Sequence, residues 1–238
     1  MKKLAGFLGV LLLVACAPLA QAAIQISIDS GGGPAICGTN ASSAGPVTCS
    51  AVAGPGFTID VLSASSNSPG SPALSQQFGS TLVIRTTAAV DLTIYMSAQG
   101  FNAPTTPPGI TYASSLSITA TTGTGTADLT SCVDTSNGLT PPTNPFCSSP
   151  AATIVNDQES YSGASSDSKT KTTTISTLTT TPYALAQQIT LHLGAGSNLN
   201  VISSQVLSNV PEPASFAFLG TMLLGAGAVL RKKLMNRA

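Results

Sequence analysis

The sequence predicts an all-β protein whose antiparallel sheets pack as a β-sandwich or a jelly-roll-like body. Three observations lead to this fold class. Apolar and polar residues alternate with a period of two in many short segments, glycine and proline interrupt these segments at short intervals, and no helical periodicity extends through the central part of the chain. Serine and threonine fill the polar positions, as expected for the solvent-facing sites of half-buried strands.

The first predicted strand covers residues 24–29, where isoleucine alternates with polar residues. The clearest alternation covers residues 90–97, and the short link at 86–89 predicts a hairpin with the β-rich run 81–86. With the weaker candidates there are roughly eight to ten short strands. These further strands are expected at 57–61, 116–118, 152–155, 171–180, 189–193 and 199–207, with loops at 37–49, 63–72, 100–109 and 132–150.

Residues 1–22 have the organisation of a signal peptide. Two lysines precede an apolar stretch of 11 residues at 4–14, which is too short for a comfortable membrane span, and a small-x-small pattern ends at Ala22. Cleavage between Ala22 and Ala23 is therefore expected. The run Leu13-Val14-Ala15-Cys16 also fits the lipobox of bacterial lipoproteins, in which Cys16 would be lipidated; we favour ordinary cleavage because a C-terminal segment already supplies an anchor.

Residues 210–238 read as a second sorting segment that follows the predicted exported domain, residues 23–209. The motif Pro211-Glu212-Pro213 precedes 17 uncharged residues at 214–230, which is the lower limit for a transmembrane helix across a core of about 30 Å. The tail 231–238 is basic and is expected to stay in the cytoplasm. Its positive charges are Arg231, Lys232, Lys233 and Arg237.

This three-part segment resembles the PEP-CTERM sorting signal of Gram-negative bacteria. The resemblance rests on Pro211, Glu212 and Pro213, on the apolar run, and on the basic patch that begins at Arg231. It implies recognition by an exosortase in the inner membrane, cleavage near the motif, and transfer of the body to the cell surface, in a setting of exopolysaccharide and biofilm production. The resemblance covers 29 of 238 residues, and it predicts where the protein is sent rather than what activity it has.

The charge of the predicted exported body excludes nucleic acid as a partner. Both ends hold most of the positive charge, and between residues 24 and 209 there are three basic and eight acidic side chains, a net charge of −5. Binding to DNA or RNA depends on clustered lysine and arginine, which this body lacks.

Four cysteines of the body are expected to form disulfides. An even number of cysteines in an exported chain favours a disulfide framework. Four cysteines allow three connectivities, of which the local one closes two loops rich in glycine and proline, and each such disulfide would stabilise the fold by roughly 3 kcal/mol. The paired spacing of a zinc site is absent. The local pairs are Cys37 with Cys49 and Cys132 with Cys147.

No catalytic set, metal site or cofactor site is predicted. His192 is the only histidine and fits an exposed strand position, and no G-x-S-x-G motif is present. Asp157 and Glu159 form a close acidic pair in an expected polar loop, where solvation explains them better than glycoside hydrolysis. The run 134–138, D-T-S-N-G, has some features of a calcium loop, but a turn stabilised by Asn and Gly is the simpler reading.

The sequence therefore predicts a non-enzymatic exported protein of the cell surface or extracellular matrix, held transiently in the inner membrane and processed by an exosortase. The alternative is a carbohydrate- or ligand-binding β-sandwich module that uses aromatic side chains in loops at one end. An enzyme with few catalytic residues ranks last. The candidate aromatic residues are Tyr95, Phe101, Tyr112, Tyr161 and Tyr183.

Overall fold

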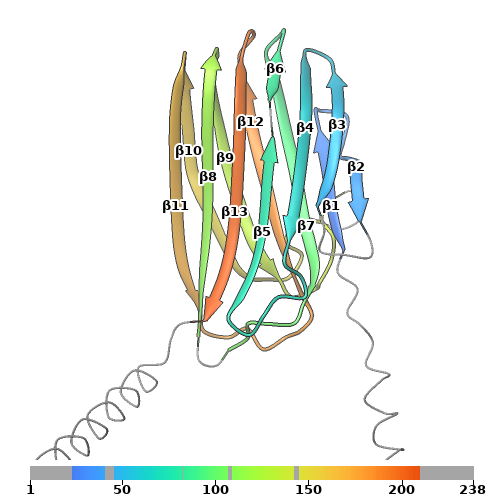
Figure 1. Ribbon diagram of the computed structural model, residues 1–238, viewed down its shortest axis with the longest axis vertical. Helices are drawn as coiled ribbons and strands as arrows, with labels where there is room; N and C mark the ends of the chain where they lie inside the picture. The colour runs from blue at the N-terminus through green and yellow to red at the C-terminus, as the bar shows by residue number, and fades with distance from the viewer. Residues whose placement is uncertain (1–22, 41–45, 82, 107–108, 142–144, 210–238) are drawn as a thin grey trace, which may run out of the picture.

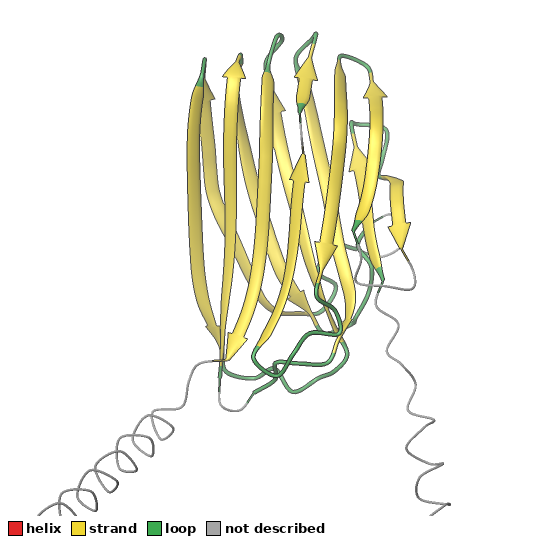
Figure 2. Ribbon diagram, in the orientation of Figure 1, coloured by secondary structure: helices red, strands yellow, loops and turns green. Residues whose placement is uncertain are grey.

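The described residues of the computed structural model, 23–40, 46–81, 83–106, 109–141 and 145–209, form thirteen strands and no helix (Figures 1 and 2). Accordingly, no described helix has the length and hydropathy needed to cross a membrane. The predicted signal peptide 1–22 and the sorting segment 210–238, with its expected helix 214–230, lie outside these residues. The predicted all-β class is confirmed.

Two antiparallel sheets face each other. Sheet A has the order β10-β9-β12-β7-β1-β2, and sheet B has the order β11-β8-β13-β5-β4-β3, with β6 pairing with β13 and β4. The strands of sheet A are β1 (Ile24–Asp29), β2 (Ala35–Asn40), β7 (Val90–Phe101), β9 (Thr124–Asp134), β10 (Pro150–Ser162) and β12 (Tyr183–Leu193). Those of sheet B are β3 (Val47–Gly54), β4 (Phe57–Ser66), β5 (Leu74–Thr81), β6 (Ile84–Thr86), β8 (Ile110–Thr122), β11 (Ser165–Ile175) and β13 (Asn198–Asn209).

Short turns at the upper end of the sandwich in Figure 1 carry the chain from one sheet to the other. The connections β6–β7, β8–β9, β10–β11 and β12–β13 all change sheet. Gly123 makes the tightest of them, because it has a φ of +91° and a Cβ there would lie 2.4 Å from the Cα of Ser197. The predicted hairpin across residues 86–89 is therefore wrong: β6 pairs with β13 and β4, and the link delivers β7 to the opposite sheet.

The core lies between the sheets and follows the period of two. Ile189, Leu191 and Leu193 of β12 are buried, and the residues between them lie on the outer face. Polar side chains also enter this interior: Gln77, Gln187 and Gln205 are fully buried on three different strands. The phenol of Tyr112 donates to the Gln205 side-chain oxygen at 2.8 Å, and Ser203 donates to that of Gln187 at 2.5 Å.

Strand boundaries depart from prediction in several places. The expected loop 63–72 contains the end of β4, and the expected strand 171–180 only overlaps β11, which ends at Ile175. The expected loop 37–49 contains parts of β2 and β3, and Asp157 and Glu159 lie within β10, at an irregularity of its pairing with β9, rather than in a loop. The described parts of 135–149 are irregular, as expected.

The structure contains both predicted local disulfides. Cys37 and Cys49 have Cα atoms 5.8 Å apart and join β2 of sheet A to β3 of sheet B, so this bond links the two sheets at their open edge. Cys132 and Cys147 have Cα atoms 6.3 Å apart and attach the irregular segment to β9.

Candidate functional site

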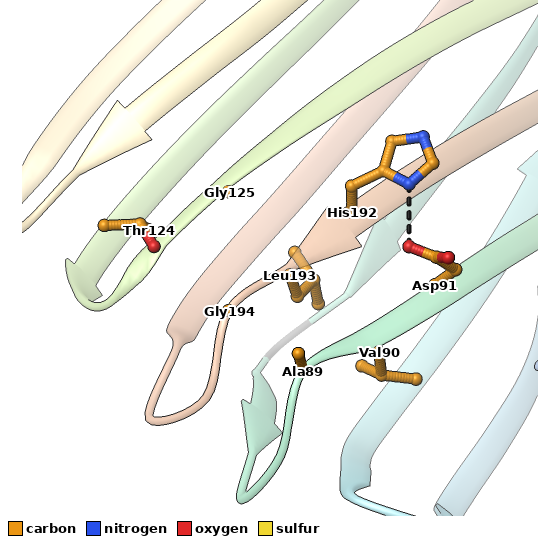
Figure 3. A pocket seen from close by; sticks show the side chains of 8 residues that line it. All are labelled: Ala89, Val90, Asp91, Thr124, Gly125, His192, Leu193 and Gly194. Carbon is orange, nitrogen blue, oxygen red and sulfur yellow. Dashed lines mark hydrogen bonds and ion pairs between the residues drawn. The ribbon is translucent and has the colours of Figure 1, made fainter.

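The pair His192 and Asp91 is the first candidate, because it borders a shallow hollow at the upper end of sheet A (Figure 3). The two residues are paired on the neighbouring strands β12 and β7, and His192 Nδ1 lies 2.7 Å from Asp91 Oδ1. Both side chains are more than half exposed. Thr124 supplies the only hydroxyl group of the lining and lies on the far side of the hollow from His192. His192 thus occupies the exposed strand position that was predicted. Among the residues that line the hollow, none is a nucleophile next to it.

Asp134, the first residue of the possible calcium loop, uses its carboxylate to order the chain that follows. It is 3% exposed and accepts from the backbone N–H groups of Ser136 at 2.9 Å, and of Ser148 and Ser149 at 3.1 Å each. Asn137 adopts a φ of +54° and accepts from the backbone N–H of Gly100 at 2.7 Å. The simpler reading of this segment as a turn agrees with these contacts, and the described residues hold no cluster of three metal-ligating side chains.

The described residues 135–141 and 145–149, called here the covering loop, lie across the lower part of the outer face of sheet A. Gln25 donates to the carbonyl oxygens of Thr140 and Pro141, both at 3.0 Å, and Ser27 donates to Pro141 at 2.5 Å. The N–H of Thr140 donates to Ser97 Oγ at 3.0 Å. These contacts bury polar residues of β1 and β7 that would otherwise face solvent.

Above the covering loop, the outer face of sheet A presents a polar surface, called here the platform. Pairing places Asp91, His192 and Thr126 in one row, and Thr93, Thr190 and Asp128 in the next. The third row consists of Tyr95, Gln188 and Thr130, and Asp29 lies beside Thr93 at the β1 side. These side chains are half-buried or exposed. The platform is therefore a shallow array of hydroxyl, amide and carboxylate groups.

Tyr95 is the only tyrosine of the chain that reaches this surface. Its ring is half-buried, 6.4 Å from the ring of Phe146 in the covering loop, and the two planes are tilted by 51°. Burial, followed by the nearby carboxylate of Asp29, raises the pKa of the Tyr95 phenol. Tyr95 therefore stays protonated at neutral pH and keeps both an apolar face and a hydrogen-bonding hydroxyl group.

The other predicted aromatic residues do not form a ligand site. Phe101 and Tyr183 are fully buried and stack on each other with ring centroids 5.7 Å apart. Tyr112 and Tyr161 are also buried. The expectation that these four line binding loops is wrong, because their strand positions direct them into the core.

Phe146 was not predicted as a site residue. It comes directly before Cys147, and the disulfide to Cys132 places its ring beside Tyr95. Only the neighbouring cysteine could have marked it in the sequence. Ala23 of the predicted cleavage site is buried, and its carbonyl oxygen accepts from Gln99 N–H at 2.9 Å. Ala22, Cys16, the Pro-Glu-Pro motif and the basic tail lie outside the described residues.

The protein is an antiparallel sandwich of two sheets, and the covering loop covers part of the polar outer face of sheet A. No protein-family model and no curated protein matches this chain. A structure of infectious bursal disease virus, Gx strain, aligns with 83% of this chain and 53% of its own chain, at 10% identity and a TM-score of 0.36. This chain thus spans about half the length of the viral chain.

Two carbohydrate-binding modules also align with parts of the chain. TmCBM61, in complex with β-1,4-galactotriose, aligns over 63% of this chain and 88% of its own, at 8% identity and a TM-score of 0.31. The family 11 module from Clostridium thermocellum, in complex with a β-1,3-1,4-mixed-linked tetrasaccharide, aligns over 79% and 98%, at 11% identity and a TM-score of 0.29. Scores this low carry no argument about function.

Proposed function

We propose that this protein is an exported, non-catalytic binding protein of the cell surface or matrix that holds a neutral polysaccharide on the platform. The observation that carries the proposal is the half-buried ring of Tyr95, which borders an array of hydrogen-bonding groups and is flanked by Phe146. An aromatic face can cover the apolar face of a sugar ring, while amide and hydroxyl groups bond to the hydroxyls at its edge.

The charges of the platform favour a neutral glycan over an acidic one. Asp29, Asp91 and Asp128 all lie on this face, and the body as a whole has a net charge of −5 between residues 24 and 209. An acidic polymer would be repelled over the whole approach, whereas a neutral chain meets only donors and acceptors. The proposed ligand class is therefore a neutral polysaccharide.

Export supports this function by placing the platform where such polymers occur. Two disulfides are expected in an oxidising, extracytoplasmic compartment. In this proposal the segment 210–238 acts as the PEP-CTERM signal, so an exosortase processes the protein at the inner membrane and the body passes to the surface or matrix.

A calorimetric titration with soluble neutral oligosaccharides tests the binding. Tyr95→Ala should weaken the Kd about tenfold, because one stacked ring contributes about 1.4 kcal/mol. Phe146→Ala should weaken it by a smaller factor. The matched control is Phe78→Ala, which removes an exposed ring from the opposite face and should leave the Kd unchanged.

Equal affinity of Tyr95→Ala and the unchanged protein for an oligosaccharide would refute the platform as the site. Failure of every neutral glycan on an array to bind would refute the ligand class. Substitution of Tyr112 or Phe101 is not a suitable test, since both rings lie in the core and their loss would destabilise the fold.

A further inference from the structure

The outer face of sheet B differs from the platform because it is almost free of charge. Among the described residues, its charged side chains are Asp60 and Arg85, which neutralise each other at 2.9 Å near the upper end. The remaining outward positions of β11, β8, β13 and β5 carry Ser, Thr, Asn, Gln, Ala and larger apolar residues. Figure 1 shows this face toward the viewer, and no described segment crosses it.

Two large apolar side chains occupy the centre of this face. Phe78 on β5 is 41% exposed, and Ile202 on the neighbouring β13 is 47% exposed. Ile202 pairs with Ser80, and Ser204 pairs with Phe78, so the two apolar residues are diagonal neighbours on one surface. Exposed apolar groups at the centre of a patch, with a polar rim around them, are typical of association surfaces.

Charge makes a second copy of this chain a suitable partner for the face. Two bodies that each carry −5 repel one another in most orientations, and three of the acidic side chains behind this charge, Asp29, Asp91 and Asp128, lie on the platform. Contact through sheet B brings together surfaces whose only described charges are already paired. The least unfavourable approach of two copies is therefore through this face.

The size of the face also fits a homodimer. Five neighbouring strands at about 4.8 Å spacing give a width of about 24 Å, and eight residues at about 3.4 Å each give a length of about 27 Å. The projected area is about 650 Å², close to the roughly 800 Å² per partner of a standard stable interface. A two-fold axis near β5 and β13 would place Phe78 of one copy against Ile202 of the other, as an isologous contact requires.

We propose that two copies of this protein associate through the outer face of sheet B, with Phe78 and Ile202 at the centre. Association of this kind leaves the platforms of both copies on opposite outer sides of the dimer. It rests on sheet B alone and does not depend on the glycan-binding proposal.

Photo-crosslinking of the full-length chain in intact cells tests the association. Phe78 is replaced by benzoylphenylalanine, and irradiation should give a product of twice the subunit mass whose cross-linked peptides both come from this chain. The same probe at Tyr95, on the opposite face, should give no such product. Adding Ile202→Lys should reduce the Phe78 cross-link at least fivefold, because it places an unpaired charge at the centre of the contact.

The matched control is Val155→Lys, which introduces the same charge at an apolar residue that is 55% exposed on the outer face of sheet A. It should leave the cross-link unchanged. Both replaced side chains lie at the surface, so we expect both variants to fold. The resistance of each variant to protease checks this. A Phe78 probe that yields only monomer, or that cross-links only to a different protein, overturns the proposal.

Discussion

Tyr95, Tyr112 and Tyr183 show how the position of a residue in the alternation of a strand decides its role. Tyr95 occupies an outward position of β7, whereas Tyr112 and Tyr183 occupy inward positions of β8 and β12. The alternation in the sequence could have placed Tyr95 outside, since Ile94 and Met96 flank it. It could not place Tyr183, because the flanking residues there are proline and alanine and no pattern marks the inner face.

The buried phenols predict a loss of stability in alkali. Burial raises the pKa of Tyr183 to about 12, and it also raises the pKa of Tyr112. Above the unfolded-state value of about 10, the unfolded chain loses protons that the folded chain keeps, so stability present below about pH 10 falls by about 1.4 kcal/mol per pH unit for each such tyrosine. Urea unfolding at increasing pH, followed with phenolate absorbance, should show ionisation and unfolding together.

Tyr112→Phe provides the internal comparison for this titration. It removes one ionising group, so stability should fall less steeply with pH, and it should lose about 1 kcal/mol at neutral pH because the Gln205 oxygen loses its phenol donor. Ionisation of all tyrosines at their ordinary pKa before unfolding would contradict the prediction.

At the scale of elements, sequence reasoning succeeded where apolar alternation is regular and failed where polar residues enter the core. The strand at residues 24–29 was predicted with its bounds, and the expected strands at 90–97 and 189–193 lie within β7 and β12. Strand β5 was missed because Gln77 is one of its inward residues, so its sequence does not alternate apolar with polar. Local sequence patterns also could not predict which sheet a strand joins. The link 86–89 has the length of a hairpin turn, but it connects strands of different sheets.

The two disulfides have separable roles at this scale. Replacing either pair by alanine should lower the free energy of unfolding by about 3 kcal/mol, because the closed loops are of similar length, with sequence separations of 12 and 15. Only the pair Cys132→Ala and Cys147→Ala releases the covering loop and moves Phe146 from Tyr95. This variant should also weaken oligosaccharide binding in calorimetry.

The pair Cys37→Ala and Cys49→Ala is the matched control, since that bond joins β2 to β3 and does not involve the covering loop. It should keep the oligosaccharide Kd while losing similar stability. Equal Kd values for the two double variants would show that the covering loop is held by its hydrogen bonds alone.

At the scale of the whole molecule, the described chain begins and ends at the same end of the sandwich (Figure 1). The carbonyl oxygen of Ala23 accepts a hydrogen bond from the N–H of Gln99 at the lower end of β7. The backbone N–H of Asn209 donates to the carbonyl oxygen of Ala73 at 3.2 Å. A tether at either end would therefore leave both faces and the upper turns accessible. Removal of residues before Ala23 or after Asn209 takes away no described strand and leaves both sheets complete.

Processing is predicted to make two cuts, one directly before the first described residue, Ala23, and one shortly after the last, Asn209. Mass spectrometry of the protein from fractionated cells should find Ala23 as the first residue and a C-terminus near Pro211–Pro213, in the surface or extracellular fraction. In cells without exosortase, the same N-terminus should occur on a chain that retains residues 214–238 in the inner membrane. A lipidated Cys16 at the N-terminus would instead establish a lipoprotein, and an unprocessed chain in the cytoplasm would refute export.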